Sequence, residues 1–371
     1  MRAIHMPGVP DGEFSPYTFP TKPCPPDDLQ YSDDFPDPTI PVESSSNTYT
    51  VQVYATALTK GELGWAELLE PQRFHSFGGP IPGRDLVGSV IGVHPCASGE
   101  TPKYQVGDQI WGFLHEDGEG AAADQALVRE QDITHLPAKP ATAPVQWKES
   151  LATIPLSGLT AWQALFEHGR LTASKQDPST RKRILITGAA GSVGIPTVQL
   201  AKLYDFHVTA LCSKRHRPFL TAELGVDEII DYTTADFKDV PSYARAKGLP
   251  PFDLVVDCVG GLTAQAMLLE PTFVKGGGRI ILLAGPVAAY GKSLEQQIKS
   301  RCEAASVHQD FFIVKMNSAQ LDELGKLITA GLLVPHFDSV FPLHQGKQAM
   351  MKVEKKGAVG RGKVVIEVGG T

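Results

Sequence analysis

The 371-residue chain lacks the cysteine patterns that mark a disulfide framework or a structural zinc site. Its five cysteines are odd in number and scattered, and no two form a CxxC pair. No stretch approaches the roughly 20 apolar residues that cross a membrane, and the net charge of -7 comes without long basic runs. We therefore expect no nucleic acid and no membrane as partner, and a reducing, cytoplasmic setting.

The composition, 42% hydrophobic and 20% charged, is that of an ordinary globular protein, and the length suggests about two domains. The first six residues predict a short strand and not a signal peptide. Residues 7–48 are rich in Pro, Asp and Ser, and predict an extended excursion that either has no role or covers a site. Short strands separated by Gly and Pro then predict an all-β, barrel-like domain to about residue 150, with strands at 51–57, 86–93 and 126–128 and a turn and strand over 106–112.

From residue 151 the pattern changes, because strands and helices alternate along the chain. This alternation predicts an α/β domain with a doubly wound parallel sheet, whose cofactor lies at the carboxyl ends of the strands. After Asn317 we expect two more helices, at 319–330 and 345–354, and a last strand at 363–368. The six strands expected in the sheet cover residues 184–187, 208–211, 228–230, 254–257, 279–283 and 311–314.

One segment predicts a dinucleotide site directly. The apolar run at 184–186 ends in a turn that contains Gly188, Gly191 and Gly194, and a helix follows to about residue 204. Glycines let the backbone approach a pyrophosphate closely, and the helix N-terminus offers free N–H groups to the anion. A glycine-rich turn alone is weak evidence, but a strand before it and a helix after it favour cofactor binding.

The end of the next strand indicates which dinucleotide is bound. An NAD site usually has Asp or Glu there to hold the ribose 2′-hydroxyl. This chain instead has Ser213, Lys214 and Arg215. A hydroxyl and two cations suit the charge and the acceptor oxygens of a 2′-phosphate, so the sequence favours NADP over NAD. The alternative is that the cations only form a solvated face.

Taken together, four motifs resemble the medium-chain dehydrogenase/reductase superfamily, and within it the zinc-free quinone oxidoreductase and enoyl reductase branch. They are residues 188–194 (GAAGSVG), 155–162 (PLSGLTAW), 106–108 (VGD) and 257–261 (DCVGG). The resemblance implies a GroES-like β-barrel domain, residues 1–150 and 315–371, and a Rossmann NADP-binding domain, residues 151–314. It also implies a cleft between them and a possible homodimer formed through the Rossmann edge strand near residues 279–283.

The resemblance implies the residues of the NADPH site as well. Val259, Leu283 and Phe311 have core packing as their alternative role, and the alternative for Tyr232 and Lys60 is that they do not contact the cofactor. The implied cofactor-binding residues are Lys60, Thr160, Ala190, Gly191, Ser192, Val193, Ser213, Lys214, Arg215, Tyr232, Cys258, Val259, Leu283, Ala284 and Phe311.

The same resemblance predicts no catalytic metal. Zinc-dependent members have a cysteine where this chain has Thr59, and a Gly-His-Glu where it has Gly83, Arg84 and Asp85. A cation cannot ligate zinc, and a hydroxyl is a poor ligand. The catalytic residues stay unknown. The cleft candidates are Thr59, Trp65, Arg84 and Asp85, although Arg84 and Asp85 are more simply an ion pair at the surface or in the cleft, and Trp65 either walls the substrate pocket or plugs the barrel.

These observations together predict an NADPH-dependent reductase that transfers a hydride to an activated C=C bond or a quinone without zinc. The expected partner is a small enone, enoyl or quinone substrate, reduced by hydride delivery in a dry cleft with donors near the developing oxyanion. Two alternatives stay open. One is a biosynthetic enzyme of specialised metabolism with a different reaction, and the other is a non-catalytic NADPH-binding protein.

Overall fold

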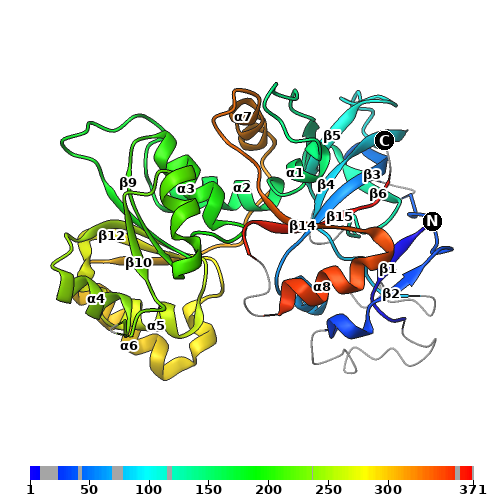
Figure 1. Ribbon diagram of the computed structural model, residues 1–371. Coiled ribbons are helices and arrows are strands. Elements are labelled where there is room, and N and C mark those ends of the chain that lie inside the picture. Colours follow the sequence, from blue (N-terminus) through cyan, green and yellow to red (C-terminus); the bar gives the residue numbers. More distant parts are fainter. Residues whose placement is uncertain are drawn as a thin grey trace. The chain divides into compact units, whose positions relative to one another are not determined.

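The computed structural model describes residues 1–8, 24–40, 44–68, 78–114, 119–235, 237–355 and 360–369, with no side chains given for 66–68. The chain divides into two compact units, each coherent in itself (Figure 1). Unit 1 comprises Met1–Leu159 and Met316–Thr371, and unit 2 comprises Thr160–Lys315. The first boundary lies after the expected residue 150, because the start of α2 (Pro155–Trp162) is bound to unit 1 through the backbone N–H of Leu156.

Unit 1 is built around one long strand, β3 (Thr48–Leu58), whose inward side chains Val51, Val53 and Ala55 are fully buried. This strand pairs with β4, β6 and β15, so the C-terminal segment returns to the β-domain as the resemblance implied. The sheet has the order β14-β15-β3-β4-β5-β7, with β6 on β3. The other strands are β4 (Asp85–His94), β5 (Gln109–Phe113), β6 (Gln125–Arg129), β7 (Ile133–His135), β14 (Phe337–Pro342) and β15 (Lys363–Glu367).

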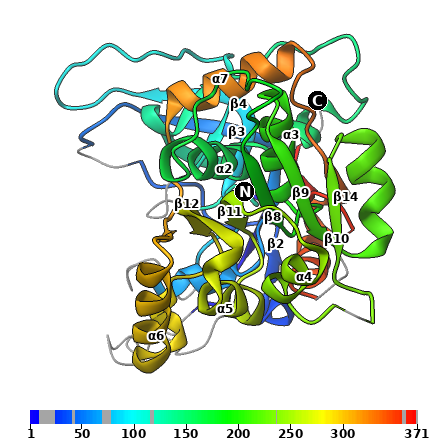
Figure 2. The ribbon, with the colours of Figure 1, turned by 90° about the vertical axis from the view of Figure 1, so that its left-hand side faces the viewer.

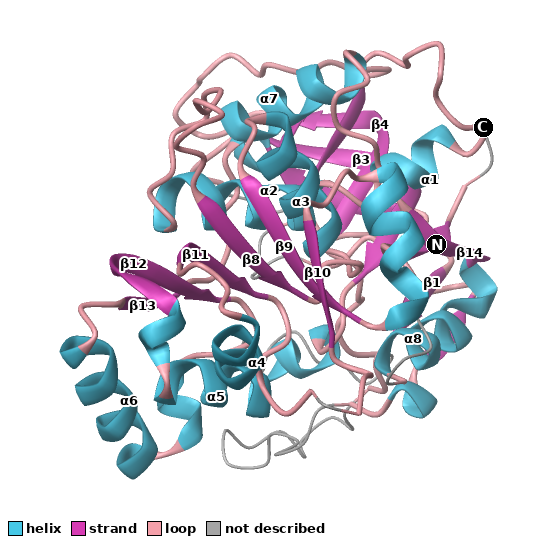
Figure 3. Cartoon of the chain, turned by 60° about the vertical axis from the view of Figure 1, so that its left-hand side comes forward, coloured by secondary structure: helices cyan, strands magenta, loops and turns pink. Residues whose placement is uncertain are grey.

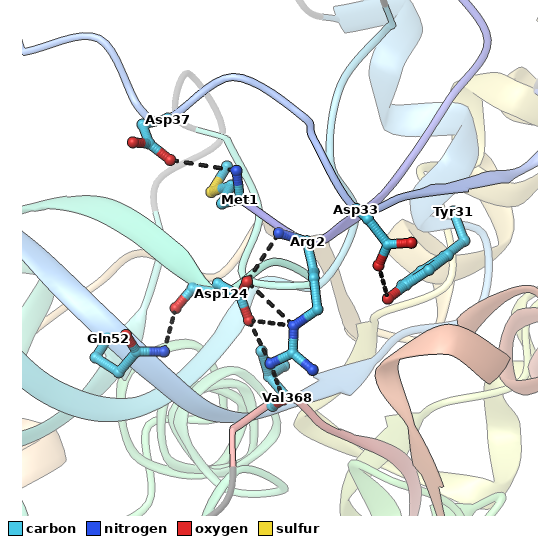
Figure 4. A network of polar contacts seen from close by, with 8 residues as sticks. All are labelled: Met1, Arg2, Tyr31, Asp33, Asp37, Gln52, Asp124 and Val368. Atoms are coloured by element: carbon cyan, nitrogen blue, oxygen red, sulfur yellow. Dashed lines mark hydrogen bonds and ion pairs between the residues drawn. The ribbon is translucent and has the colours of Figure 1, made fainter.

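The N-terminus is held against unit 1 by charged contacts (Figure 4). The Arg2 guanidinium binds the Asp124 carboxylate and the carbonyl oxygen of Val368, and the Met1 ammonium lies 3.4 Å from Asp37. Strand β1 (Ala3–His5) pairs with β2 (Gln30–Ser32), which follows the 3-10 helix η1 (Pro26–Asp28). The described part of the expected 7–48 excursion therefore contains a paired strand. Its remainder, 9–23 and 41–43, lies outside the described residues.

Unit 2 contains six parallel strands in the order β10-β9-β8-β11-β12-β13. The order reverses between β8 and β11, where ligands bind in doubly wound sheets. Helix α3 packs on β8 and β9, whereas α4, α5 and α6 pack in a row on the opposite face (Figures 2 and 3). The strands are β8 (Arg183–Thr187), β9 (His207–Cys212), β10 (Glu228–Asp231), β11 (Phe252–Asp257), β12 (Val274–Leu282) and β13 (His308–Phe311).

The α/β fold class with a barrel-like domain and a doubly wound sheet is confirmed, and one detail of the sheet is corrected. The strand expected at the edge, β12, pairs on its outer side with β13, where Leu282 faces Phe311. Among the described residues β13, and not β12, is thus the strand at that edge, and β10 is at the other. The remaining α-helices are α1 (Trp147–Leu151), α3 (Gly194–Leu203), α4 (Val240–Lys247), α5 (Gly261–Leu269), α6 (Lys292–Ala304), α7 (Ser318–Thr329) and α8 (Gly346–Glu354).

The other short helices connect these elements, and none of the described helices has the length and apolar character needed to cross a bilayer. Two of the short helices belong to the site described below, η2 (Glu62–Leu68) in unit 1 and η6 (Lys214–His216) in unit 2. The rest are η4 (Glu130–Asp132), η5 (Gln163–His168), η7 (Phe219–Glu223), η8 (Pro271–Phe273), η9 (Val287–Tyr290) and η10 (Leu343–Gln345).

Candidate active site

The glycine-rich loop of unit 2 is tightly folded, and two of its glycines stand where a side chain is unfavourable. Gly188 has φ +59, a conformation that favours glycine. A Cβ on Gly194 would lie 2.3 Å from the carbonyl oxygen of Gly188 and 2.7 Å from Cα of Ala189.

Helix α3 begins at Gly194, and the side chain of the residue before it, Val193, makes no capping hydrogen bond. The N–H of Ile195 donates to the carbonyl oxygen of Gly191 over 3.0 Å, and Pro196 has no N–H. The N–H groups left for an anion at this end of the helix are those of Ser192, Val193 and Gly194, which have no backbone partner among the described residues.

A buried aspartate joins this loop to the neighbouring strand end. Thr187, which ends β8, donates to the Asp257 carboxylate over 2.6 Å, and the backbone N–H of Cys258 donates to the Thr187 hydroxyl. The N–H of Gly260 donates to the other carboxylate oxygen over 2.9 Å. Burial raises the pKa of Asp257. Asp257 was not predicted as a site residue and appeared only within the motif at 257–261. Its position next to the predicted cofactor-binding residues Cys258 and Val259 could have indicated its role.

The end of β9 offers the polar group expected for a 2′-phosphate. The Ser213 hydroxyl oxygen is buried and has no hydrogen-bond partner among the described residues. Lys214 and Arg215 follow it, exposed, in η6. Tyr232 is half-exposed and adjacent, because its backbone N–H donates to the carbonyl of Cys212 over 3.2 Å. The structure thus gathers Ser213, Lys214, Arg215 and Tyr232 at one corner of the sheet.

The apolar candidates gather at the ends of β11, β12 and β13. A Cβ on Gly260 would lie 2.7 Å from Cβ of Ala284, so the loops after β11 and β12 touch. Leu283 donates its N–H to the carbonyl of Asp257, and Val259 is 51% exposed, which core packing alone would not leave. Phe311 ends β13 beside Leu282.

The arrangement in unit 2 fits a dinucleotide. A close-packed glycine turn, a helix N-terminus and a buried unpartnered hydroxyl beside two cations are the groups that bind its phosphates. Thr160 is buried in α2, where unit 2 begins, and Lys60 is exposed in unit 1. Both stay predictions.

Unit 1 contains a second group of candidate residues, centred on a buried ion pair. The Lys363 ammonium and the Asp85 carboxylate form a salt bridge, with side chains 1% and 0% exposed. The other Asp85 oxygen accepts the N–H of Leu156 over 2.7 Å. The Arg84 side chain is buried as well. Of the two places expected for an Arg84–Asp85 ion pair, the surface is wrong, because both residues are buried. The cation that binds Asp85 comes from β15, 278 residues along the chain.

Glu62 lies in the electrostatic field of this pair and was not predicted as a functional residue. Burial raises its pKa to about 8, although the charges of Lys363 and Arg84 oppose that shift. Thr59 also belongs to this cluster, because its carbonyl accepts the N–H of Glu62. Trp65 lies half-buried in η2, which leaves both of its alternatives open.

A hollow of about 470 Å³ lies elsewhere in unit 1, under α7. It is lined by Trp111 and His135 on one side, and by Asp322, Lys326 and Thr329 on the other. None of the site residues predicted from the sequence belongs to this lining. The hollow therefore adds nothing to the candidate site.

Comparison with known proteins connects these features. The family model described as "Zinc-binding dehydrogenase" matches residues 224–366. "Probable zinc-binding oxidoreductase, mitochondrial" of Arthroderma benhamiae is 29% identical over 333 residues, 89% of this chain and 91% of that protein. "Quinone-oxidoreductase QR1, chloroplastic" of Triphysaria versicolor is 31% identical over 287 residues, 77% of this chain and 79% of that protein. The chain belongs to the medium-chain dehydrogenase/reductase superfamily. The resemblance stated from the motifs is thereby confirmed.

The fold of this superfamily member agrees with solved structures. The quinone oxidoreductase from Coxiella burnetii superposes with a TM-score of 0.73 at 22% identity, covering 100% of this chain and 99% of that one. At this identity the likeness concerns the fold alone. Both the Rossmann sheet and the β-domain take part in the match, since the whole chain is covered.

The family name implies zinc, but the residues in the corresponding place do not fit it. Thr59 offers a hydroxyl, and Arg84 is a cation, in contrast to the thiolate and imidazole ligands that zinc takes. The Asp85 carboxylate is already bound by Lys363 and by the N–H of Leu156, and the two cations beside it would repel a metal ion. Within the part of the chain that the structure describes, no group of three or more His, Cys, Asp or Glu side chains could hold a metal ion. The residues present therefore do not fit a catalytic zinc ion.

The comparisons also correct the expected cytoplasmic setting. The two relatives named above are a mitochondrial and a chloroplastic protein, so that expectation is wrong. All five cysteines are free thiols.

Proposed function

We propose that this superfamily member is an NADPH-dependent reductase that transfers a hydride to an activated C=C bond or to a quinone. The observation that carries the proposal is the buried, unpartnered Ser213 hydroxyl beside Lys214 and Arg215, at the corner of a sheet whose glycine loop is built for a pyrophosphate. The names of the relatives, an oxidoreductase and a quinone oxidoreductase, support the class of reaction.

In this proposal bound NADPH supplies the hydride, and the protein positions the reactants. The N–H groups of Ser192, Val193 and Gly194, in the loop and at the start of α3, hold the pyrophosphate, and Ser213, Lys214 and Arg215 hold the 2′-phosphate. Asp257 acts through its hydrogen bonds: it fixes the loops after β8 and β11 at the switch point, where the nicotinamide binds. Val259, Leu283 and Ala284 exclude water from the ring.

The test is NADPH oxidation by the purified protein with three acceptors: cyclohex-2-enone, a crotonyl thioester and 1,4-benzoquinone. We expect turnover with at least one of these classes, and reduced product in equal amount to the NADPH consumed. Oxidation no faster than the protein-free blank with all three acceptors contradicts the proposal. A homodimer, formed through the edge strand β13 and not β12, is the proposed assembly, and light scattering after gel filtration measures it.

A further inference from the structure

The hollow under α7 has the size of a small-molecule site. Its volume of about 470 Å³ lies within the range of about 300–1,000 Å³ that is typical of such sites. One wall comes from β5 and from the end of β7 with the residues after it, and the other wall comes from α7. Every lining residue belongs to unit 1, so the hollow is complete within that unit.

The floor of the hollow is fixed by the packing of α7 on the β-domain. Trp111 is fully buried, and its indole N–H donates to the Thr134 hydroxyl over 2.9 Å. Gly325 of α7 packs directly on this ring, because a Cβ added to it would lie 3.5 Å from the ring and 3.5 Å from Pro137. The Thr329 hydroxyl donates to a backbone carbonyl after β7 over 3.3 Å and ties the end of the helix down. The hollow is therefore formed before any ligand arrives, which lowers the cost of binding.

Helix α7 contributes the charged groups of the lining. Asp322, Lys326 and Thr329 follow one another at helical spacing and share one face of the helix. The Lys326 ammonium lies 3.1 Å from the Glu323 carboxylate, so its charge is compensated by a neighbour. The Asp322 carboxylate, in contrast, forms no hydrogen bond or ion pair with any described residue. The charge that is left over at the hollow is therefore negative.

The charges that act on Tyr104, next to the hollow, have the same sign. The Tyr104 ring packs edge-on against the imidazole of His135, with 5.0 Å between the ring centroids. Burial raises the pKa of Tyr104 to about 12, and the negative charges of Asp322, Glu130 and Asp108 add to that rise. Three carboxylates thus make the potential beside the hollow negative. Such a potential attracts cations and repels anions.

His135 supplies a second acceptor, from the wall opposite α7. It is exposed, and neither nitrogen of its imidazole ring has a hydrogen-bond partner among the described residues. A neutral imidazole accepts a hydrogen bond at one nitrogen. Pro137 and Ala330 add apolar surface to the lining. A carboxylate, an imidazole and apolar carbon together suit a compact organic cation that has several N–H donors and a flat apolar body.

We propose that the hollow is a ligand site for small aromatic amines in their ammonium form. The ammonium group donates to the Asp322 carboxylate and to the free ring nitrogen of His135, and the aromatic ring covers Pro137 and Ala330. The buried Trp111 limits how deeply the ring enters. The site shares no residue with the proposed cofactor site, so its test does not depend on NADPH oxidation.

The experiment titrates the 371-residue protein with three molecules of similar size and different charge: phenethylamine, 2-phenylethanol and phenylacetate. The readout is the indole N–H resonance of Trp111 in ¹⁵N-labelled protein, one of four such resonances. Thr134→Val identifies it, because this variant removes the hydrogen-bond acceptor of that indole alone.

The three molecules should rank by charge. We expect phenethylamine to shift the Trp111 resonance in a saturable way, with a Kd of about 1 mM or below. 2-Phenylethanol should bind at least about tenfold more weakly, since it lacks the charge-assisted hydrogen bond. Phenylacetate should leave the resonance unchanged, because the negative potential repels it.

Asp322→Asn separates the proposed contact from nonspecific binding. The side chain keeps its size and loses its charge, so the Kd for phenethylamine should rise at least about tenfold, while the Kd for 2-phenylethanol should stay the same. The matched control is Glu100→Gln, which neutralises an exposed carboxylate of unit 1 outside the lining and should change neither Kd.

Three results overturn the inference. The first is a Trp111 resonance that does not move at about 10 mM phenethylamine. The second is an equal Kd for phenethylamine and phenylacetate, which would mean that charge plays no part. The third is an equal Kd of phenethylamine for the wild type and Asp322→Asn, which would place the binding elsewhere on the protein.

Discussion

Replacing Lys363 by methionine leaves the Asp85 carboxylate buried without its ammonium partner. The two side chains are 1% and 0% exposed, so water cannot take over the lost contact. Removing one partner of a buried ion pair costs about 3–5 kcal/mol of unfolding free energy. The N–H of Leu156 still binds Asp85 in the variant and keeps the loss within that range.

The stability lost in Lys363→Met depends on pH, and the burial of Asp85 determines whether the loss grows or shrinks as the pH rises. Burial already raises the pKa of Asp85, and loss of the Lys363 charge raises that pKa further. The folded variant therefore binds a proton more readily than the unfolded chain, whose Asp has a pKa of about 3.9. Stability then falls as the pH rises above that unfolded value, so we expect Lys363→Met to be less destabilised at pH 5 than at pH 8.

Urea unfolding followed by tryptophan fluorescence measures this free energy at both pH values. Asp85→Asn combined with Lys363→Met should recover most of the loss, because it removes the buried charge. The matched control is Lys326→Met, which removes an exposed salt bridge to Glu323 and should lower the unfolding free energy by less than about 1 kcal/mol. A cost below about 1 kcal/mol for Lys363→Met at pH 8, or an equal cost at pH 5, refutes the reasoning.

Two other changes test local packing and protonation. Gly194→Ala should weaken NADPH binding at least tenfold in a fluorescence titration, because its Cβ would meet the carbonyl oxygen of Gly188 at 2.3 Å, an overlap of the kind that costs about 1–3 kcal/mol; an unchanged Kd would speak against the tight loop. His5 is buried and accepts a hydrogen bond from Ser32, and burial lowers its pKa. The unfolded chain therefore binds a proton at this histidine more readily than the folded protein does. The free energy of unfolding should fall as the pH drops below about 6.5 in the wild type, and less so in His5→Gln. An equal fall for the two proteins, measured by urea unfolding at several pH values, would contradict this.

The nucleotide-binding unit was largely predictable from the sequence, because its strands are apolar runs and its turn is rich in glycine. Helix α6 was missed, since only Ile298 and Cys302 of its 13 residues are buried and its apolar pattern is weak. Strand β14 was missed as well, since each of its residues is half-buried and no alternation marks it. Hydrophobic periodicity in a sequence marks only those helices and strands that bury one face, and these two elements bury almost none.

The candidate residues of unit 1 were predictable only in part. Arg84 and Asp85 stood out because they replace a zinc-binding pattern, but the partner of Asp85 is Lys363, which no spacing rule connects to it. Glu62 looked like any acidic residue at a helix start. Its burial, and the absence of a partner for it within the described residues, arise from the tertiary fold of the β-domain. The unpartnered oxygens of Thr59 and Ser157 have the same origin.

The ratio of kcat/KM for NADPH to that for NADH, measured with one acceptor in the wild type and in a Ser213→Ala, Arg215→Ala variant, tests the central claim most directly. Hydrogen bonds to a charged group are worth about 1.5–3 kcal/mol each. The wild type should therefore prefer NADPH by at least about tenfold, and the variant should lose that preference while keeping its rate with NADH. A wild type that uses both cofactors equally, or prefers NADH, would contradict the assignment of the 2′-phosphate to Ser213, Lys214 and Arg215.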